Sequence, residues 1–241
     1  MGFGTSLELS DNGRFLIVGA ERGGWRRPED AISGENATGG AYLYDLRDPC
    51  NPLFLGMPGR YLDEFGQPKQ GALGSRQGKA VSVENRGNIG FALVGAPSSS
   101  LGGTLSGYAT LSEIQSTQLS FADPIRLPPN DISFAGVGLP FERGRKPFDF
   151  TGDAVALSPV KPNLGVISSP NRRYVDAILG GFLGVRGRVS GFSTSPLGST
   201  ATLLPTLGME NFGGSLAMSN TRSLVAIGLD TDRRGMPGVR S

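Results

Sequence analysis

Apolar and polar residues alternate in four short stretches of the chain, at residues 6–10, 80–84, 154–158 and 215–219. Such alternation predicts a β-strand with one apolar and one polar face. After a short connection, each stretch is followed by a nearly continuous apolar segment, at residues 14–18, 90–94, 164–167 and 223–227. A short apolar run of this kind predicts a strand buried on both faces. The pattern therefore predicts four similar strand pairs.

The clearest connection within a pair is Ser10-Asp11-Asn12-Gly13-Arg14. Asp and Asn before Gly tolerate the positive φ values that a two-residue β-hairpin requires. We therefore expect a two-residue hairpin here, with Asp11 and Asn12 as turn formers.

Further strands are expected in these units. Third strands are predicted at residues 40–46, 106–111 and 187–192, and weaker apolar segments for an outermost fourth strand lie at residues 51–56, 125–129 and 200–207. The 38 glycines and 17 prolines among 241 residues favour many short strands joined by turns. Four antiparallel strands per unit are typical of a β-propeller blade.

The strand pairs are led by Gly4, Gly78, Gly152 and Gly213, at intervals of 74, 74 and 61 residues. Regular spacing of this size indicates repeated structural units such as propeller blades. We expect these glycines near the central axis, where backbone approaches backbone. The predicted fold is an all-β propeller with blades at 1–75, 76–149, 150–210 and 211–241. Glycine-rich hairpins of a β-sandwich are the alternative, although a sandwich has no reason to repeat one motif every 74 residues.

Short segments at matching places in the four units resemble the FG-GAP repeat of integrin α subunits and related extracellular propellers. They cover about a third of the chain, and the second unit has Gln77 where the repeat has Phe. The matching segments are residues 3–4, 18–20 and 40–44, then 77–78, 95–97 and 108–111, then 150–152 and 168–170, and finally 212–213 and 228–229.

The resemblance implies four-stranded antiparallel blades in an incomplete ring of three and a half blades, belonging to a longer chain or assembly. It also implies a non-catalytic binding or adhesion module, outside the cell or on its surface, that contacts ligand through the loops between second and third strands. Two alternatives stay open. One is a structural propeller that packs within a larger surface or filament protein, and the other is an accessory domain of a larger hydrolase.

Several functional classes are disfavoured by composition. The net charge of +2 does not suggest nucleic-acid binding, and no apolar stretch of about 18 residues predicts a membrane span. No signal peptide is visible in this segment. The chain has no histidine, no nucleophile elbow and no phosphate-binding loop, so we expect neither an enzyme nor a cofactor. The single cysteine, Cys50, is expected to be a small packed residue.

The resemblance to FG-GAP repeats also bears on metal binding, because such repeats often hold calcium between their first and second strands. Calcium requires several oxygen ligands at short spacing. None of the four connections in this chain offers three carboxylates, so we expect no metal site there.

The loops between second and third strands carry the candidate binding residues. Arginine beside an aromatic ring can meet carboxylates or sulfates and can stack on planar groups, so the expected partner is a protein or an anionic glycan. The alternative is that these arginines offset neighbouring acids on a solvated surface. The loops also contain a glycosylation sequon at Asn36, which matters if the chain enters a secretory route. The candidate binding residues are Trp25, Arg26, Arg27, Arg172, Arg173, Tyr174, Arg233 and Arg234.

Overall fold

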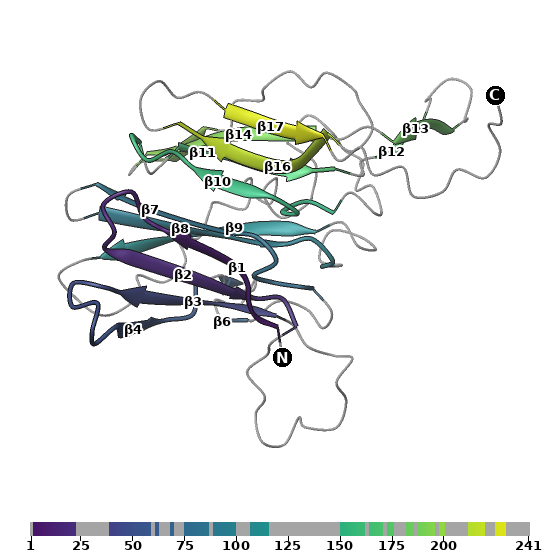
Figure 1. Ribbon diagram of the computed structural model, residues 1–241. Coiled ribbons are helices and arrows are strands. Elements are labelled where there is room, and N and C mark those ends of the chain that lie inside the picture. The colour runs from purple at the N-terminus through teal and green to yellow at the C-terminus, as the bar shows by residue number, and fades with distance from the viewer. Residues whose placement is uncertain are drawn as a thin grey trace, which may run out of the picture.

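The computed structural model describes the chain as a succession of short β-strands (Figure 1). No helix occurs within the residues that it describes, so the predicted all-β class is confirmed. The described residues are 2–22, 39–58, 61–62, 68–69, 75–86, 89–99, 107–115, 150–161, 164–170, 173–175, 182–185, 188–195, 198–200, 212–219 and 225–229.

Four antiparallel sheets follow one another along the chain, and we number them in that order. The first sheet has the strand order β1-β2-β3-β4, with β1 at Phe3–Leu9, β2 at Phe15–Ala20, β3 at Gly40–Asp45 and β4 at Leu53–Gly56. The second has the order β7-β8-β9, with β7 at Val81–Arg86, β8 at Ile89–Ala96 and β9 at Tyr108–Gln115. The third has the order β10-β11-β14-β15, with β10 at Val155–Leu157, β11 at Leu164–Ser169, β14 at Arg188–Ser195 and β15 at Gly198–Thr200. The fourth pairs β16 at Phe212–Met218 with β17 at Val225–Leu229.

Two small ribbons lie in the connections between these strands. One pairs β5 (Tyr61–Leu62) with β6 (Pro68–Lys69), and the other pairs β12 (Arg173–Val175) with β13 (Phe182–Val185). Each of the described sheets falls within one predicted unit of the chain. The propeller blade boundaries stay predictions.

The outermost strands agree only in part with the sequence pattern. The segment predicted at residues 51–56 forms β4, beside β3. In the third sheet the outer strand is β15, which starts at Gly198, before the predicted range of 200–207. It starts there because Gly198 already pairs with Ser195 of β14. The predicted strand at residues 125–129 lies outside the described residues.

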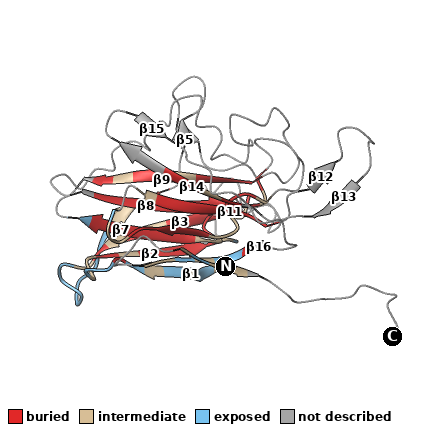
Figure 2. Cartoon of the chain, turned by 90° about the horizontal axis from the view of Figure 1, so that it is seen from above, coloured by how far each residue is buried: buried red, intermediate tan, exposed pale blue. Residues whose placement is uncertain are grey.

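The second strand of each pair was predicted to be buried on both faces. This is confirmed for β2, β8 and β11, whose described side chains are almost all buried (Figure 2). It is wrong for β17, in which Ala226 is exposed and Val225 and Ile227 are half-buried. The reason is that, among the described residues, the fourth sheet is covered on one face only, by the third sheet.

The four sheets pack face to face in succession, and three apolar clusters lie between them. Phe15, Ile17 and Leu43 of the first sheet pack against Val81 and Val83 of the second. The second and third sheets meet through a cluster that includes Phe91, Leu93, Leu157, Ile167 and Phe192. The third and fourth sheets meet through Val166 and Val189 against Leu216 and Val225. Each middle sheet is therefore covered on both faces.

The four leading glycines share one backbone conformation that L-residues avoid. A Cβ atom at Gly78 would overlap the carbonyl oxygen of Gly40, and one at Gly152 would overlap that of Tyr108. The predicted close backbone approach is thus confirmed at these two positions. It is wrong at Gly4, where nothing lies within 4 Å, because no described sheet packs beside it there. The φ values are 85° at Gly4, 80° at Gly78, 87° at Gly152 and 94° at Gly213.

The hairpin between β1 and β2 is longer than predicted. Leu9 pairs with Leu16, and the Ser10 amide donates to the Phe15 carbonyl at 2.9 Å, so four residues form the connection rather than two. Only Gly13 takes a positive φ, of 70°. The turn is closed by Asn12, whose Oδ1 accepts hydrogen bonds from Ser10 Oγ at 3.0 Å and from the Arg14 amide at 3.1 Å. The turn-forming role of Asn12 is therefore confirmed.

Cys50 was predicted to be a packed residue, and this is wrong. Its side chain is an exposed free thiol in the turn between β3 and β4. The turn is organised by Asp48, whose carboxylate accepts a hydrogen bond from the Cys50 amide at 3.1 Å. Because this holds the backbone in a surface turn, the side chain projects into solvent.

Candidate functional site

Most of the predicted binding residues lie outside the described part of the chain, namely Trp25, Arg26, Arg27, Arg172, Arg233 and Arg234, together with the sequon at Asn36. Arg173 and Tyr174 belong to β12, where they pair with Val185 and Gly184 of β13. This ribbon lies in the connection between β11 and β14. The grouping of the arginine pairs on one face therefore stays a prediction.

The bases of the first two predicted binding loops are described, and they have matching positions. The loop between β2 and β3 ends at Gly39, which forms a parallel bridge with Gln77. The loop between β8 and β9 ends at Gly107, which forms the same bridge with Thr151. Gln77 and Thr151 each directly precede a leading glycine of the next sheet. Both loops therefore rejoin their sheets at the same edge, beside the first strand of the following sheet.

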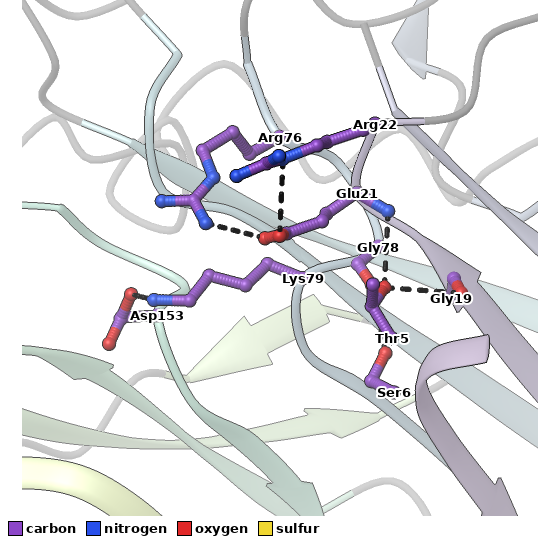
Figure 3. Close-up of polar contacts among 9 residues, drawn as sticks. All are labelled: Thr5, Ser6, Gly19, Glu21, Arg22, Arg76, Gly78, Lys79 and Asp153. Carbon is purple, nitrogen blue, oxygen red and sulfur yellow. Dashed lines mark hydrogen bonds and ion pairs between the residues drawn. The ribbon is translucent and has the colours of Figure 1, made fainter. Parts of the chain in front are cut away.

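An ion pair ties the first of these loop bases to the second sheet (Figure 3). Arg76 Nη2 lies 2.6 Å from Glu21 Oε2, while Arg22 Nε lies 3.8 Å from Glu21 Oε1. Arg76 has a positive φ of 55°, and Phe150, which is 74 residues further on, has a φ of 52°. A residue that is neither Gly nor Asn keeps such a conformation only where its surroundings hold it. At Arg76 the ion pair with Glu21 is one such constraint.

A second ion pair joins the second and third sheets at the equivalent end. Lys79 Nζ contacts Asp153 Oδ1, and both side chains retain some exposure (Figure 3). Three cations, Arg22, Arg76 and Lys79, thus face two carboxylates in this region. The pairs of Arg76 with Glu21 and of Lys79 with Asp153 link consecutive sheets, whereas Arg22 contacts the adjacent Glu21.

Hydroxyl groups on β1 complete the polar contacts at this end. The Thr5 hydroxyl accepts a hydrogen bond from the Glu21 amide at 3.2 Å and donates to the Gly19 carbonyl at 3.3 Å. The Ser6 hydroxyl donates to the carbonyl of Gly78 at 2.8 Å. These contacts fix the end of β2, where the first predicted binding loop begins.

Two carboxylates, those of Glu8 and Glu84, lie in the contacts between consecutive sheets. Glu8 Oε1 accepts a hydrogen bond from Ser82 Oγ at 2.8 Å, and the same Ser82 oxygen accepts one from the Leu157 amide at 2.9 Å. This short chain of hydrogen bonds links β1, β7 and β10. Burial raises the pKa of Glu8 from 4.5 to about 7, although the Ser82 hydrogen bond opposes this shift. The charge of Glu84 raises it further.

Glu84 makes the second such contact. Its Oε2 accepts a hydrogen bond from the Asp11 amide at 3.1 Å, across the first and second sheets. Burial raises the pKa of this carboxyl, while the Asp11 hydrogen bond lowers it. Both glutamates thus favour a proton more than an exposed carboxylate does.

The described residues contain no group of three or more His, Cys, Asp or Glu side chains that could hold a metal ion. In the connection between β1 and β2, Asn12 Oδ1 is already occupied by hydrogen bonds within the turn. The expectation of no tight calcium site stays a prediction. In the same part of the chain, no helix is long and apolar enough to cross a membrane.

The contacts between sheets were missed in the sequence, although a signal for them was present. Glu8 and Ser82, Lys79 and Asp153, and Arg86 and Val160 are each 74 residues apart and joined by a hydrogen bond. That interval equals the spacing of the first three leading glycines. Pairing each polar residue with the one 74 positions later would have suggested these contacts.

Comparison with known proteins adds no family assignment, because neither a protein-family model nor a curated protein matches the chain.

Proposed function

We propose that the chain is a segment of a β-propeller of the FG-GAP type and that it works as a non-catalytic binding module, outside the cell or on its surface. In this proposal the loops between second and third strands contact a protein or an anionic glycan.

The main support for the propeller is that the first two strands of the first and fourth sheets pair in the same register. Ser6 pairs with Gly19 and Ser215 with Gly228, and both sheets have an irregularity just before this pair, after Phe3 and after Phe212. A sandwich contains one interface between two sheets, whereas this chain has three successive interfaces among four sheets. Repetition of one sheet around an axis accounts for both observations.

The bases of the loops support the placement of the binding surface. Gly39 and Gly107 hold equivalent bridges to the next sheet, so at least the first two loops start from equivalent points. Equivalent starting points favour a common face for the loop residues.

The binding surface can be tested with an anionic glycan array at low and at physiological salt. We expect salt-dependent binding, because arginine contacts with sulfate or carboxylate groups are screened by ions. The variants replace one arginine pair by two serines at Arg26 and Arg27, at Arg172 and Arg173, or at Arg233 and Arg234. Each should weaken binding and change the free energy of unfolding by less than about 0.5 kcal/mol.

Arg47→Ser is a control for the loss of one positive charge outside the loops. Arg47 follows β3 at the end opposite to the predicted binding loop, and its side chain is exposed beside Asp45. It removes one positive charge without touching the loops, so binding should be unaffected. The proposal fails if no glycan binds, or if Arg47→Ser weakens binding as much as the loop variants do.

A structural scaffold is the second candidate function. It is favoured by the apolar face that the first sheet exposes, since apolar patches of this kind mark contact surfaces.

A further inference from the structure

Two guanidinium groups converge on one carboxylate where the first predicted binding loop leaves β2. Arg22 Nε lies 3.8 Å from Glu21 Oε1, and Arg76 Nη2 lies 2.6 Å from Glu21 Oε2 (Figure 3). Glu21 and Arg22 directly follow β2 of the first sheet, whereas Arg76 precedes β7 of the second sheet. We call these two arginines, brought together from consecutive sheets, the Arg22–Arg76 site.

The Arg22–Arg76 site carries an excess of positive charge. Glu21 supplies one carboxylate for two guanidinium groups, and arginine stays protonated in proteins. The neighbouring ion pair of Lys79 with Asp153 brings one charge of each sign, so it does not alter this balance. Two like charges that are held near one another repel, and a second anion bound beside them lowers the electrostatic energy.

Both arginines also keep hydrogen-bond donors that Glu21 does not use. A guanidinium group has several N–H donors in a fixed plane. Arg76 donates one hydrogen bond to Glu21, whereas the 3.8 Å contact of Arg22 is too long for a hydrogen bond. Neither side chain has another acceptor within the described part of the chain. The side chain of Arg22 is 78% exposed and that of Arg76 40%, so a ligand can reach these donors from solvent.

The backbone holds both arginines in place before any ligand binds. Arg76 has a φ of 55°, and its carbonyl accepts a hydrogen bond from the Lys79 amide at 3.1 Å, which closes a tight turn. The residue after Arg76 bridges to Gly39, at the end of the first predicted binding loop. At the start of that loop, the Glu21 amide donates to the Thr5 hydroxyl at 3.2 Å. A site that is already ordered loses less entropy when it binds.

We propose that Arg22 and Arg76 together bind a sulfate or carboxylate group from solvent, and that this group is an acidic substituent of a glycan. The planar guanidinium fork fits the paired oxygens of such groups. Arg22 also comes shortly before Trp25 in the chain, at the start of the predicted binding loop. That the acidic group belongs to a glycan rests on the proposed function, whereas the anion site itself does not.

The test is a titration of the isotope-labelled whole chain with inorganic sulfate at constant ionic strength, followed by NMR of the arginine Nε–H signals. The signals of Arg22 and Arg76 should shift and saturate. The signal of Arg47, which is exposed at the other end of the first sheet, should not saturate. Arg22→Gln should weaken sulfate binding, read at Arg76, by at least roughly tenfold in Kd. Because Arg22 is exposed, thermal melting of this variant should match wild type.

Glu21→Gln gives the decisive measurement. It removes the internal anion, so sulfate should bind at least roughly threefold more tightly to the two arginines. Arginines that only anchor the loop would show weaker or unchanged sulfate binding in this variant. Glu113→Gln, which makes the same change of net charge on β9, is the matched control and should leave the affinity unchanged. Should Glu21→Gln fail to fold, Arg22→Gln decides alone.

Sulfate shifts that are equal at Arg47, or a Glu21→Gln variant without tighter binding, overturn the proposal. Titration with a sulfated monosaccharide and with glucuronate tests the glycan part, and either sugar should shift the same two signals while uncharged glucose should not. If glycans bind on the array and Arg22→Gln does not weaken them, this inference is wrong and the proposed function stands. If sulfate binds as expected and no acidic sugar or array glycan does, the anion site stands and the glycan function is wrong.

Discussion

Glu8 of β1 contacts Ser82 of β7, and its titration should make the stability of the fold depend on pH. Replacing Glu8 by Gln should remove this dependence. Burial raises the pKa of Glu8 to about 7 in the folded chain, against 4.5 for an ordinary glutamate. The folded state therefore holds this proton more tightly than the unfolded state does. Its contribution to stability is complete below pH 4.5 and is lost as the pH rises through 7. Glutamine keeps an oxygen that can accept the Ser82 hydrogen bond and does not titrate.

The size of the effect follows from the two pKa values. One pKa unit corresponds to about 1.4 kcal/mol, so a rise from 4.5 to about 7 is worth about 3 kcal/mol at most. Because Glu8 is half-buried and partly screened by water, we expect about 1–3 kcal/mol. At pH 5 the Glu8→Gln variant should exceed the wild type in stability by less than about 1 kcal/mol. At pH 8 the variant should be the more stable by about 1–3 kcal/mol.

Urea unfolding at several pH values between 5 and 8 measures this difference. The background is simple, since the chain has no histidine, the side chain that ordinarily titrates in this range. Glu113→Gln makes the same change of net charge on β9 and serves as the control. Glu84→Gln should remove a further part of the dependence, because burial also raises the pKa of Glu84. If the stability of wild type and Glu8→Gln changes with pH in parallel, the account of this contact is wrong.

Two further predictions concern the backbone and metal binding. Gly78→Ala should destabilise the fold by about 3 kcal/mol or more in urea unfolding, because φ is 80° and the new Cβ would overlap the Gly40 carbonyl oxygen. Gly13→Ala, at a φ of 70° but in open space, should cost only about 1 kcal/mol, and equal losses would contradict the steric argument. Calcium titration should show no tight site and chelation should leave the melting temperature unchanged, whereas clear stabilisation by micromolar calcium would reveal a site in the strand connections.

The all-β class and the positions of the strand pairs could be predicted from the sequence. Alternation in β1 and the apolar run in β2 depend on the local period of two that a strand imposes, and that period is visible in any window of the chain. The leading glycines were also visible, because their spacing repeats. The turn role of Asn12 was predictable because a short side chain can hydrogen-bond its own backbone.

Which faces are buried was decided only by the tertiary structure. Alternation in β7 predicts a polar face in water, yet Ser82 and Glu84 are both buried. Val81 and Val83 of β7 are buried as well, whereas Leu7 and Leu9, at the matching positions of β1, are exposed. The difference arises because the second sheet has a neighbour on each side, and a strand's own sequence does not state how many sheets will cover it.

The candidate site divides in the same way. The arginine pairs were found by their composition, whereas the pairing of Arg76 with Glu21 emerged only when consecutive sheets were packed together. The pairing of Lys79 with Asp153 had only the 74-residue interval as a signal in the sequence. These partners lie 55 and 74 residues apart in the chain. A contact between distant residues depends on how whole sheets stack, because apolar burial drives the stacking and the polar partners are then brought within reach.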